Sequence, residues 1–322
     1  LPGTYALLVR ATEALAGSML RIEASSVCPL WCPAGSPAHG KNRGVIGRGV
    51  LKLDDFKRMV DDNPRVRAIE LSNWGEIFLN PQLAEIIRYA ALKGIKLKAS
   101  NGVNLNSVSD ELLRTLVAHG FDHLSVSIDG ATHETYKIYR RKGSFGRVIR
   151  NIERINYFKR HYDSSRPKLS WQFIIFGHNE HELGAAERLA GELGMEFRPK
   201  LNHTPRYSPV RDSDGVRRRS GIGAADRDEF ASRKGRAYSR PCTQLWDSPQ
   251  INWDGKLLGC CVNKFGDFGN AFEVGLASVL LGERYRYAQR MVLGLAPPRA
   301  DIPCVRCKVY LKYVMNKSGA KH

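Results

Sequence analysis

The sequence contains no uninterrupted run of about 18 apolar residues, the length that a membrane-spanning helix needs. It also has no internal repeat and no low-complexity segment, which argues against solenoid and disordered architectures. The apolar stretch 5–9 is soon interrupted by Arg10 and Glu13, so it does not read as an export signal. We therefore expect an amphipathic lead-in helix over residues 1–19, a cytoplasmic location and no membrane partner.

Acidic residues are scarce relative to basic ones. The 322 residues include 32 Asp and Glu against 50 Lys and Arg, giving a formal net charge of +18. A basic protein invites a nucleic-acid or acidic partner. Only 217–219 forms a dense basic run, however, and the other basic residues are spread along expected helices. We interpret the charge as a solvated basic surface and do not expect a nucleic-acid partner.

Cysteines are few, and they are clustered. Four of the seven form two close pairs, Cys28 with Cys32 and Cys304 with Cys307. Without an export signal, this number of cysteines does not suggest a disulfide framework. Close spacing of thiols instead favours metal binding at two places in the chain.

Residues 20 to 200 alternate between strand-like and helix-like patterns, which predicts an α/β fold with a parallel sheet and right-handed crossovers. The expected strands are 20–24, 67–71, 95–99, 124–128, 169–176 and 195–198. The expected helices are 53–60, 83–92, 111–117, 133–139, 145–158 and 181–193. The pattern fits either a partly closed (β/α)6 barrel or an open doubly wound sheet. In both, ligands bind at the carboxyl ends of the strands.

The last third of the chain has a different character. Residues 202–240 form a polar connector rich in Pro, Gly and Arg. A small Cys-rich module follows over 241–322, where 249–258 reads as a hairpin with Asp254-Gly255 at its turn. We take 20–201 as the main domain.

The first cysteine pair lies directly after the first expected strand, in the sequence Cys-Pro-Leu-Trp-Cys-Pro-Ala-Gly from Cys28 to Gly35. A cysteine in place of Gly35 would complete the C-x3-C-x2-C loop of the radical S-adenosylmethionine (SAM) enzymes, which this segment resembles. In that family three thiolates hold a [4Fe–4S] cluster whose fourth iron binds SAM. The resemblance implies Cys28 and Cys32 as ligands of an impaired SAM-binding cluster. His39 is a conceivable replacement ligand, although an exposed loop histidine is the simpler interpretation.

Three further motifs resemble the same family, each placed after an expected strand. They are Asn73-Trp74-Gly75-Glu76 after the second strand, Ser100-Asn101-Gly102 after the third, and Ser127-Ile128-Asp129-Gly130 with Tyr139-Arg140 after the fourth. The resemblance implies a partial (β/α)6 TIM-like barrel that binds SAM. Gly75 and Glu76 would receive its amino group, and Ser127, Asp129 and Arg140 would contact its ribose hydroxyls and carboxylate. Asn101 belongs to the same expected site.

The C-terminal cysteines resemble the shortened SPASM, or twitch, module of radical SAM enzymes. By this resemblance Cys242, Cys260, Cys304 and Cys307 would hold one auxiliary [4Fe–4S] cluster. A structural zinc ion also takes four thiolates and remains an alternative. Cys261 adjoins Cys260, and the sequence does not decide which of the two is the ligand.

The resemblance implies an oxidoreductase-type enzyme that reduces SAM to a 5′-deoxyadenosyl radical and abstracts hydrogen from a substrate. It would receive electrons from a flavodoxin- or ferredoxin-type donor. We expect oxidation or dehydrogenation of a small molecule in natural-product biosynthesis, assisted by the auxiliary cluster. Peptide maturation is an alternative, and the basic surface would suit an acidic leader. Because Gly35 replaces a cluster cysteine, a non-catalytic variant that binds a single cluster is a third hypothesis.

Overall fold

The structure is a computed structural model that describes residues 18–35, 44–238 and 242–313. His39 therefore lies outside the described residues. So does the expected lead-in helix 1–19, except for residues 18 and 19. The centre of the fold is a seven-stranded parallel sheet in the order β6-β5-β4-β3-β2-β1-β7. The strands are β1 (Met19–Ile22), β2 (Ala68–Glu70), β3 (Lys96–Val103), β4 (His123–Ser127), β5 (Lys168–Ile175), β6 (Glu196–Leu201) and β7 (Gln250–Ile251).

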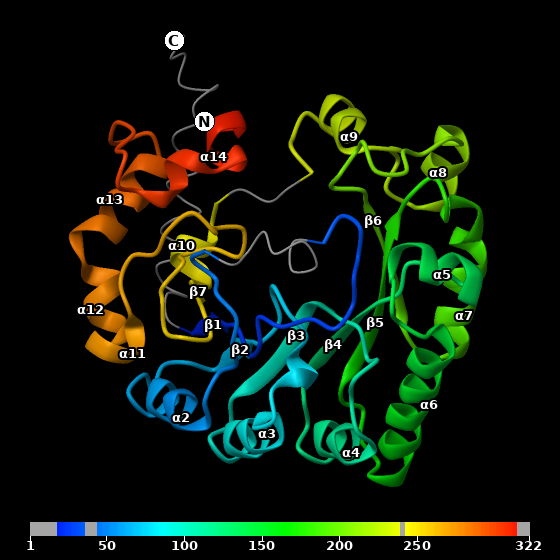
Figure 1. Ribbon diagram of the computed structural model, residues 1–322, viewed down its shortest axis with the longest axis horizontal. Coiled ribbons are helices and arrows are strands. Elements are labelled where there is room, and N and C mark those ends of the chain that lie inside the picture. Colours follow the sequence, from blue (N-terminus) through cyan, green and yellow to red (C-terminus); the bar gives the residue numbers. More distant parts are fainter. Residues whose placement is uncertain (1–17, 36–43, 239–241, 314–322) are drawn as a thin grey trace.

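Strands β1 to β6 lie side by side in chain order, without the reversal that defines a doubly wound sheet. Right-handed crossovers in one direction then place the connecting helices on one side of the sheet, where Figure 1 shows them. These helices are α2 (Leu53–Asp61), α3 (Leu83–Leu92), α4 (Asp110–Ala118), α5 (His133–Tyr139), α6 (Phe145–His161) and α7 (Leu183–Glu192). The sheet stays open between β6 and β7, so the expected partial barrel is confirmed and the doubly wound alternative is wrong.

The main core lies between the sheet and these helices. Strand side chains such as Leu20, Ile69 and Leu124 are fully buried and pack in one cluster with the apolar faces of the helices. Burial of apolar side chains of this size contributes about 1.5–3 kcal/mol each. The amino end of α4 is capped by Ser109, whose hydroxyl accepts the Leu112 N–H. The core thus fixes the strand ends from which the site is built.

Strand β7 lies in the first arm of the expected hairpin 249–258, but its addition to the barrel sheet was not expected. It comes from the C-terminal module and pairs in parallel with β1, with Arg21 opposite Gln250 and Ile22 opposite Ile251. The expected hairpin is present as the antiparallel bridge between Ile251 and Leu257. Gly255 at its turn has a φ of +88°, which favours glycine. The module therefore continues the barrel sheet beyond β1.

The rest of the described chain is made of short helices. The segment 202–240 contains α8 (Ser213–Arg219) and α9 (Arg227–Lys234), whose Val216 and Phe230 are buried. The module contains α10 (Gln244–Asp247), α11 (Ala271–Val274), α12 (Leu276–Leu281), α13 (Glu283–Val292) and α14 (Lys308–Tyr313). The 3-10 helices are η1 (Ile77–Leu79), η2 (Glu180–Glu182) and η3 (Pro303–Arg306).

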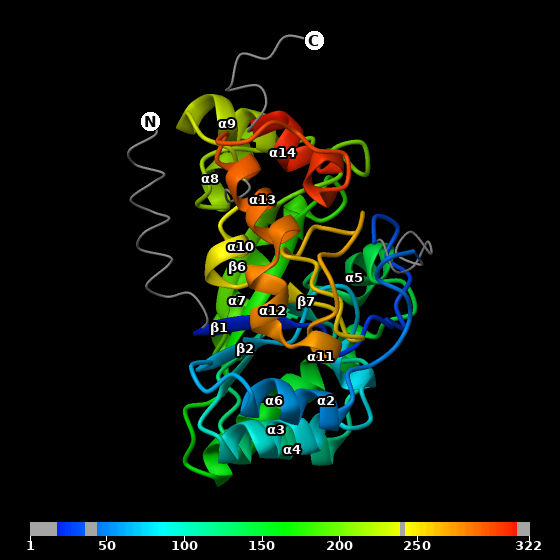
Figure 2. The ribbon, with the colours of Figure 1, turned by 90° about the vertical axis from the view of Figure 1, so that its left-hand side faces the viewer.

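Figure 2 shows α11 to α13 in front of β1 and β7, beside the open edge of the barrel. Within the described residues, no helix has the length and apolar character needed to cross a membrane.

Candidate functional site

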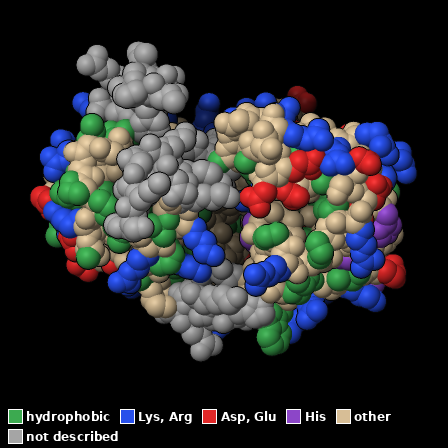
Figure 3. Space-filling view, turned by 90° about the horizontal axis from the view of Figure 1, so that it is seen from above, with side chains coloured by type: hydrophobic (Ala, Val, Ile, Leu, Met, Phe, Trp, Pro, Cys, Tyr) green, Lys and Arg blue, Asp and Glu red, His purple; other side chains and the backbone are tan. Residues whose placement is uncertain are grey.

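A cavity of about 270 Å³ lies at the carboxyl ends of the barrel strands. Viewed from above, the molecule is hollowed near its centre (Figure 3). Most residues expected at the SAM site line this cavity, namely Cys28, Cys32, Gly75, Glu76, Asn101, Ser127 and Arg140. They come from the segments that follow β1 and β2, from within β3, from the last residue of β4 and from the end of α5. The fold therefore brings together motifs that are more than 100 positions apart in sequence.

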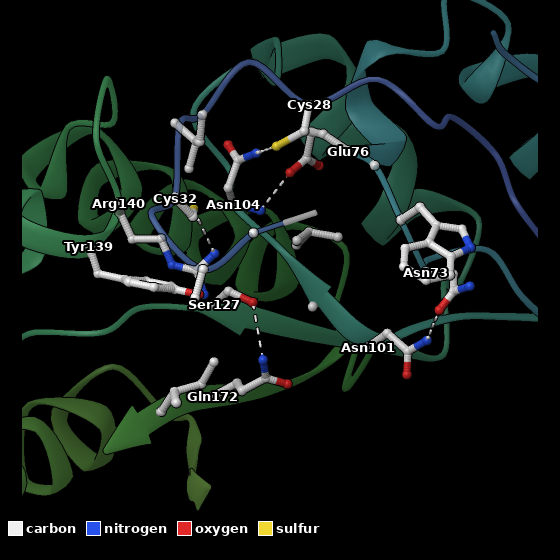
Figure 4. Close-up of a pocket in the computed structure, with 18 of the residues that line it drawn as sticks. Cys28, Cys32, Asn73, Glu76, Asn101, Asn104, Ser127, Tyr139, Arg140 and Gln172 are labelled. Atoms are coloured by element: carbon white, nitrogen blue, oxygen red, sulfur yellow. Dashed lines mark hydrogen bonds between the residues drawn. The ribbon is translucent and has the colours of Figure 1, made fainter. Parts of the chain in front are cut away.

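The loop after β1 carries both thiols into the cavity (Figure 4). The Arg140 guanidinium lies 3.8 Å from Cys32 Sγ, and the Asn104 amide lies 4.0 Å from Cys28 Sγ. The Trp31 N–H donates to the Arg141 carbonyl at 3.0 Å, which ties the loop to the end of α5. Burial raises the pKa of Cys28 to about 12 and raises that of Cys32 as well. Both thiols are therefore protonated at neutral pH although Arg140 lies beside Cys32, and a bound metal group would be needed to hold them as thiolates.

Gly35 also lines the cavity, at the place where the family carries its third thiol. Its N–H donates to the Cys32 carbonyl at 2.9 Å. A Cβ added at Gly35 would lie 3.1 Å from Cys32 Cβ and 3.2 Å from its carbonyl oxygen. Both contacts are tighter than ordinary van der Waals packing, so a side chain at position 35 requires Cys32 to move by a few tenths of an ångström. Two converging thiols beside an open cavity suit an iron–sulfur cluster, with one ligand position left without a thiol.

The segment after β2 is held by a carboxylate that the motif search did not single out. Fully buried Glu23 accepts the Trp74 N–H at 2.9 Å and the Gly75 N–H at 3.1 Å. Burial raises the pKa of Glu23 to about 8. A Cβ on Gly75 would lie 2.2 Å from the Ser25 carbonyl oxygen, so only glycine lets these two segments pass. The only sequence signal for this role was the presence of a glutamate, Glu23, near the end of an expected strand.

Glu76 lies beside Cys28, and its carboxylate is already partnered. It accepts the Asn104 N–H at 2.6 Å and the Phe78 N–H at 3.4 Å. Burial raises the pKa of Glu76 to about 7. The carboxylate is therefore held at the cavity wall by backbone donors. In that position it can accept a further hydrogen bond from a bound ammonium group.

The floor of the cavity is polar. Asn101 Nδ2 donates to the Ser72 carbonyl at 2.9 Å and to Asn73 Oδ1 at 3.1 Å. Gln172 Nε2 donates to the Ser127 hydroxyl at 3.4 Å. The motif search did not find Gln172, because a single Gln inside an apolar strand pattern carries no specific signal. These amide and hydroxyl groups can orient a polar ligand.

Asp129 is the one expected SAM-binding residue that does not line the cavity. It is fully buried, and its two oxygens accept Arg140 Nε at 2.6 Å and the Ile174 N–H at 2.7 Å. Although burial opposes charge on Arg140, the Asp129 carboxylate raises its pKa above the ordinary value. Asp129 thus fixes the charged Arg140 side chain at the cavity wall.

His203, on the loop after β6, was also missed. It lines the same cavity as the two thiols. Burial and the nearby Arg227 lower the pKa of its ring, and the neighbouring Ala34 carbonyl acts in the opposite direction. A lone His inside a polar segment gave no reason to single it out.

The C-terminal cysteines lie near one another in the module. Burial raises the pKa of Cys242 to about 11 and that of Cys304 to about 12, and it also raises that of Cys260. The charge of Cys307 raises the pKa of both Cys242 and Cys304. In the same way, the charge of Cys304 raises the pKa of Cys260. This mutual influence places all four expected ligands in one neighbourhood.

The arrangement of these cysteines bears on the kind of metal group. Four neighbouring thiols suit a [4Fe–4S] cluster, in which each thiolate would bind a different iron. A zinc ion also takes four thiolates, at about 2.3 Å, so the thiols alone do not distinguish the two. The charge of Cys261 also raises the pKa of Cys242 and that of Cys260, so Cys261 lies in the same neighbourhood.

Comparisons with known protein families match most of the chain. Residues 30–183 match the radical SAM superfamily model, and residues 242–308 match the SPASM model, described as an iron–sulfur cluster-binding domain. The first match covers β2 to β5 and most of the cavity wall. The second contains all four expected ligands of the auxiliary cluster.

A curated relative is the AdoMet-dependent heme synthase of Methanosarcina barkeri (strain Fusaro / DSM 804), which is 33% identical over 117 residues. The match covers 35% of this chain and 33% of that relative, so it spans about a third of the relative's length.

Two solved structures are similar in fold. The structure of native anSMEcpe with bound AdoMet has a TM-score of 0.60 at 15% identity, over 91% of this chain and 86% of that one. The structure of Streptococcus suis SuiB has a TM-score of 0.62 at 15% identity, over 85% of this chain and 68% of that one.

Proposed function

Because this chain belongs to the radical SAM superfamily and carries a SPASM iron–sulfur domain, with [4Fe–4S] clusters and SAM as the cofactors, we propose that it oxidises a small polar substrate through SAM-derived radical chemistry. The observation that carries the proposal is the convergence of Cys28, Cys32, Glu76 and Arg140 on one cavity. Thiols, an acceptor carboxylate and a guanidinium are the groups needed beside a cluster that binds an amino acid.

The roles of the residues follow from their chemistry. Cys28 and Cys32 would hold the SAM-binding cluster, and the four module cysteines would hold the auxiliary cluster. When bound, the two clusters would supply the electron that cleaves SAM and accept the electron that the substrate gives up. Arg140, fixed by Asp129 at 2.6 Å, would pair with a carboxylate. Glu76 would accept hydrogen bonds from an ammonium group.

Polar side chains inside the barrel support a hydrogen-bonding small molecule as the substrate. Asn101, Ser127 and Gln172 line the cavity. Lys200 donates to the Gln172 side chain, which lines the cavity. An alcohol carbon that loses one hydrogen atom to the deoxyadenosyl group, then one proton and one electron, becomes a carbonyl. We propose this alcohol dehydrogenation as the reaction class.

The test is the formation of 5′-deoxyadenosine from SAM by the reconstituted protein under anaerobic, reducing conditions. We expect product in the wild type, more of it with a substrate alcohol, and none with the double variant Cys28→Ser/Cys32→Ser. Deuterium placed on the alcohol carbon should appear in the 5′-deoxyadenosine. Wild-type product no greater than that of the double variant would overturn the proposal.

The basic surface supports a second candidate, the maturation of a peptide with an acidic leader. A net charge of +18 would attract such a segment electrostatically. Titration with acidic and neutral peptides of equal length separates the two functions. Salt-sensitive binding of the acidic peptide that increases 5′-deoxyadenosine formation supports maturation. A response to small alcohols alone supports the dehydrogenase.

A further inference from the structure

The SAM-binding cluster of the proposed function lacks a third thiol. A [4Fe–4S] cluster that leaves one iron open for SAM needs protein ligands on its other three irons. The described part of the cavity offers two thiols, Cys28 and Cys32, with Gly35 in the third position. The inference that follows rests on the proposed function and asks which residue of this chain completes the ligand set.

His203 carries an imidazole that lines the same cavity as both thiols and Gly35. It follows β6 directly, so it stands at the carboxyl end of the last strand of the barrel. Asn202 holds the turn around it, because Asn202 Oδ1 accepts the Thr204 N–H at 2.7 Å and Asn202 Nδ2 donates to the Tyr207 carbonyl at 2.9 Å. The histidine therefore sits on a turn with fixed ends.

This turn lies against the loop that carries the thiols. Tyr207 and Ala34 both pack on the small apolar cluster formed by Leu30, Cys32 and their neighbours. The Ala34 carbonyl, one residue before Gly35, is near enough to the His203 ring to influence its pKa. Histidines that bind metals characteristically donate their second ring N–H to a backbone carbonyl or carboxylate, which orients the ring. The Ala34 carbonyl would be the group for this role here.

We propose that the His203 imidazole is the third protein ligand of the SAM-binding cluster and replaces the thiolate that Gly35 cannot supply. Imidazole nitrogen binds cluster iron in Rieske centres, so the chemistry has precedent. Exchange of an anionic thiolate for a neutral imidazole makes the cluster one unit less negative. Its reduction potential should therefore be higher than that of the Gly35→Cys/His203→Ala double variant, which carries three thiolates.

Histidine-specific nitrogen labelling tests this assignment. The full chain is produced with ¹⁵N-histidine, reconstituted anaerobically, reduced without SAM, and studied by pulsed electron paramagnetic resonance. A directly bound histidine gives a strong ¹⁵N coupling, which an all-cysteine auxiliary cluster does not. We expect this coupling in the wild type and in the control variant His178→Ala, and its loss in His203→Ala.

Iron content gives an independent readout. We expect about eight irons per chain in the wild type, about four in His203→Ala, and about eight again in Gly35→Cys/His203→Ala. The rescued double variant also shows that loss of iron in His203→Ala is not a failure to fold.

Three results would overturn the inference, and they separate it from the proposed function. If His203→Ala keeps its iron and its ¹⁵N coupling, His203 is not a ligand. If the coupling disappears in His39→Ala instead, the ligand is His39. In both cases the wild type still forms 5′-deoxyadenosine, and the proposed function stands. If the wild type holds only about four irons and forms no 5′-deoxyadenosine, both fail.

Discussion

The Asn73 side-chain amide donates a hydrogen bond to the Cys261 carbonyl oxygen at 3.0 Å, although the two residues are 188 positions apart. Asn73 Oδ1 at the same time accepts the Asn101 amide at 3.1 Å. One side chain thus joins the wall of the proposed SAM cavity to the loop that carries Cys260 and Cys261. A short path of hydrogen bonds therefore connects the two proposed cluster regions.

We expect Asn73→Ala to weaken this connection. It removes both hydrogen bonds and leaves the Asn101 amide and the Cys261 carbonyl each short of a partner. The free energy of unfolding should fall by about 1–3 kcal/mol. Asn73→Ala should also alter the auxiliary-cluster resonance signal. The control Asn63→Ala, at the end of α2, should leave that signal unchanged. An unaltered signal in Asn73→Ala would show that the contact does not link the two regions.

Arg140 and Asp129 should affect SAM binding in a graded way. Arg140→Lys keeps the charge but loses the planar pair of donors, so we expect SAM affinity to fall about tenfold or more. Asp129→Asn keeps the shape but weakens the hold on Arg140, and its loss should be smaller. Equilibrium dialysis with the iron-loaded protein measures both. Arg141→Lys, on the neighbouring exposed residue, is the control, and an equal loss there would refute the assignment.

The choice between Cys260 and Cys261 can be decided by a matched pair of variants. Cys260 follows the hairpin directly. Burial raises the pKa of its thiol, and the charges of Cys304 and Cys242 add to this effect. Cys260→Ser should lower the iron content by about four atoms per chain, whereas Cys261→Ser should leave it unchanged. Iron analysis of both proteins gives the answer. The reverse pattern would make Cys261 the ligand.

Glu23 should make stability depend on pH. Burial holds its pKa in the folded chain at about 8, although the Trp74 and Gly75 N–H groups and, to a smaller extent, Arg21 lower it. Between about pH 5 and 8 the folded chain keeps a proton that the unfolded chain has released. The free energy of unfolding should then decrease by about 1.4 kcal/mol per pH unit from this group.

Glu23→Gln removes this contribution. Its unfolding free energy, measured by denaturant titration of the iron-free chain, should fall less steeply with pH than that of the wild type over the same range. The exposed Glu85→Gln serves as the control and should keep the wild-type slope. Parallel curves for wild type and Glu23→Gln would show that Glu23 is ionised in the folded chain.

The sequence was informative about the barrel because its strands carry clear patterns and the motifs follow them directly. Parallel strands bring their carboxyl ends to one edge, so the meeting of Cys28 with Glu76 and Arg140 could be expected. The pairing of β7 with β1 could not, because a two-residue strand gives no pattern of its own. Asp129 was expected in the site, yet its motif does not reveal that both of its oxygens already accept hydrogen bonds from protein donors.

Residues that act through distant contacts escaped the sequence reading. Glu23 supports Trp74 and Gly75, and Gln172 reaches Ser127, through contacts between separate strands. His203 enters the cavity only because the last barrel strand ends beside the thiol loop. None of these residues belongs to a spaced motif, so only the three-dimensional arrangement identifies them.

The measurement that tests the central claim most directly is the iron and sulfide content of the anaerobically reconstituted protein, with resonance spectra recorded with and without SAM. We predict about eight irons per chain and one signal that changes when SAM is added, since SAM binds the open iron of the first cluster. About four irons and a spectrum indifferent to SAM would contradict the account. The chain would then carry only the auxiliary cluster, and its cavity would not support radical chemistry.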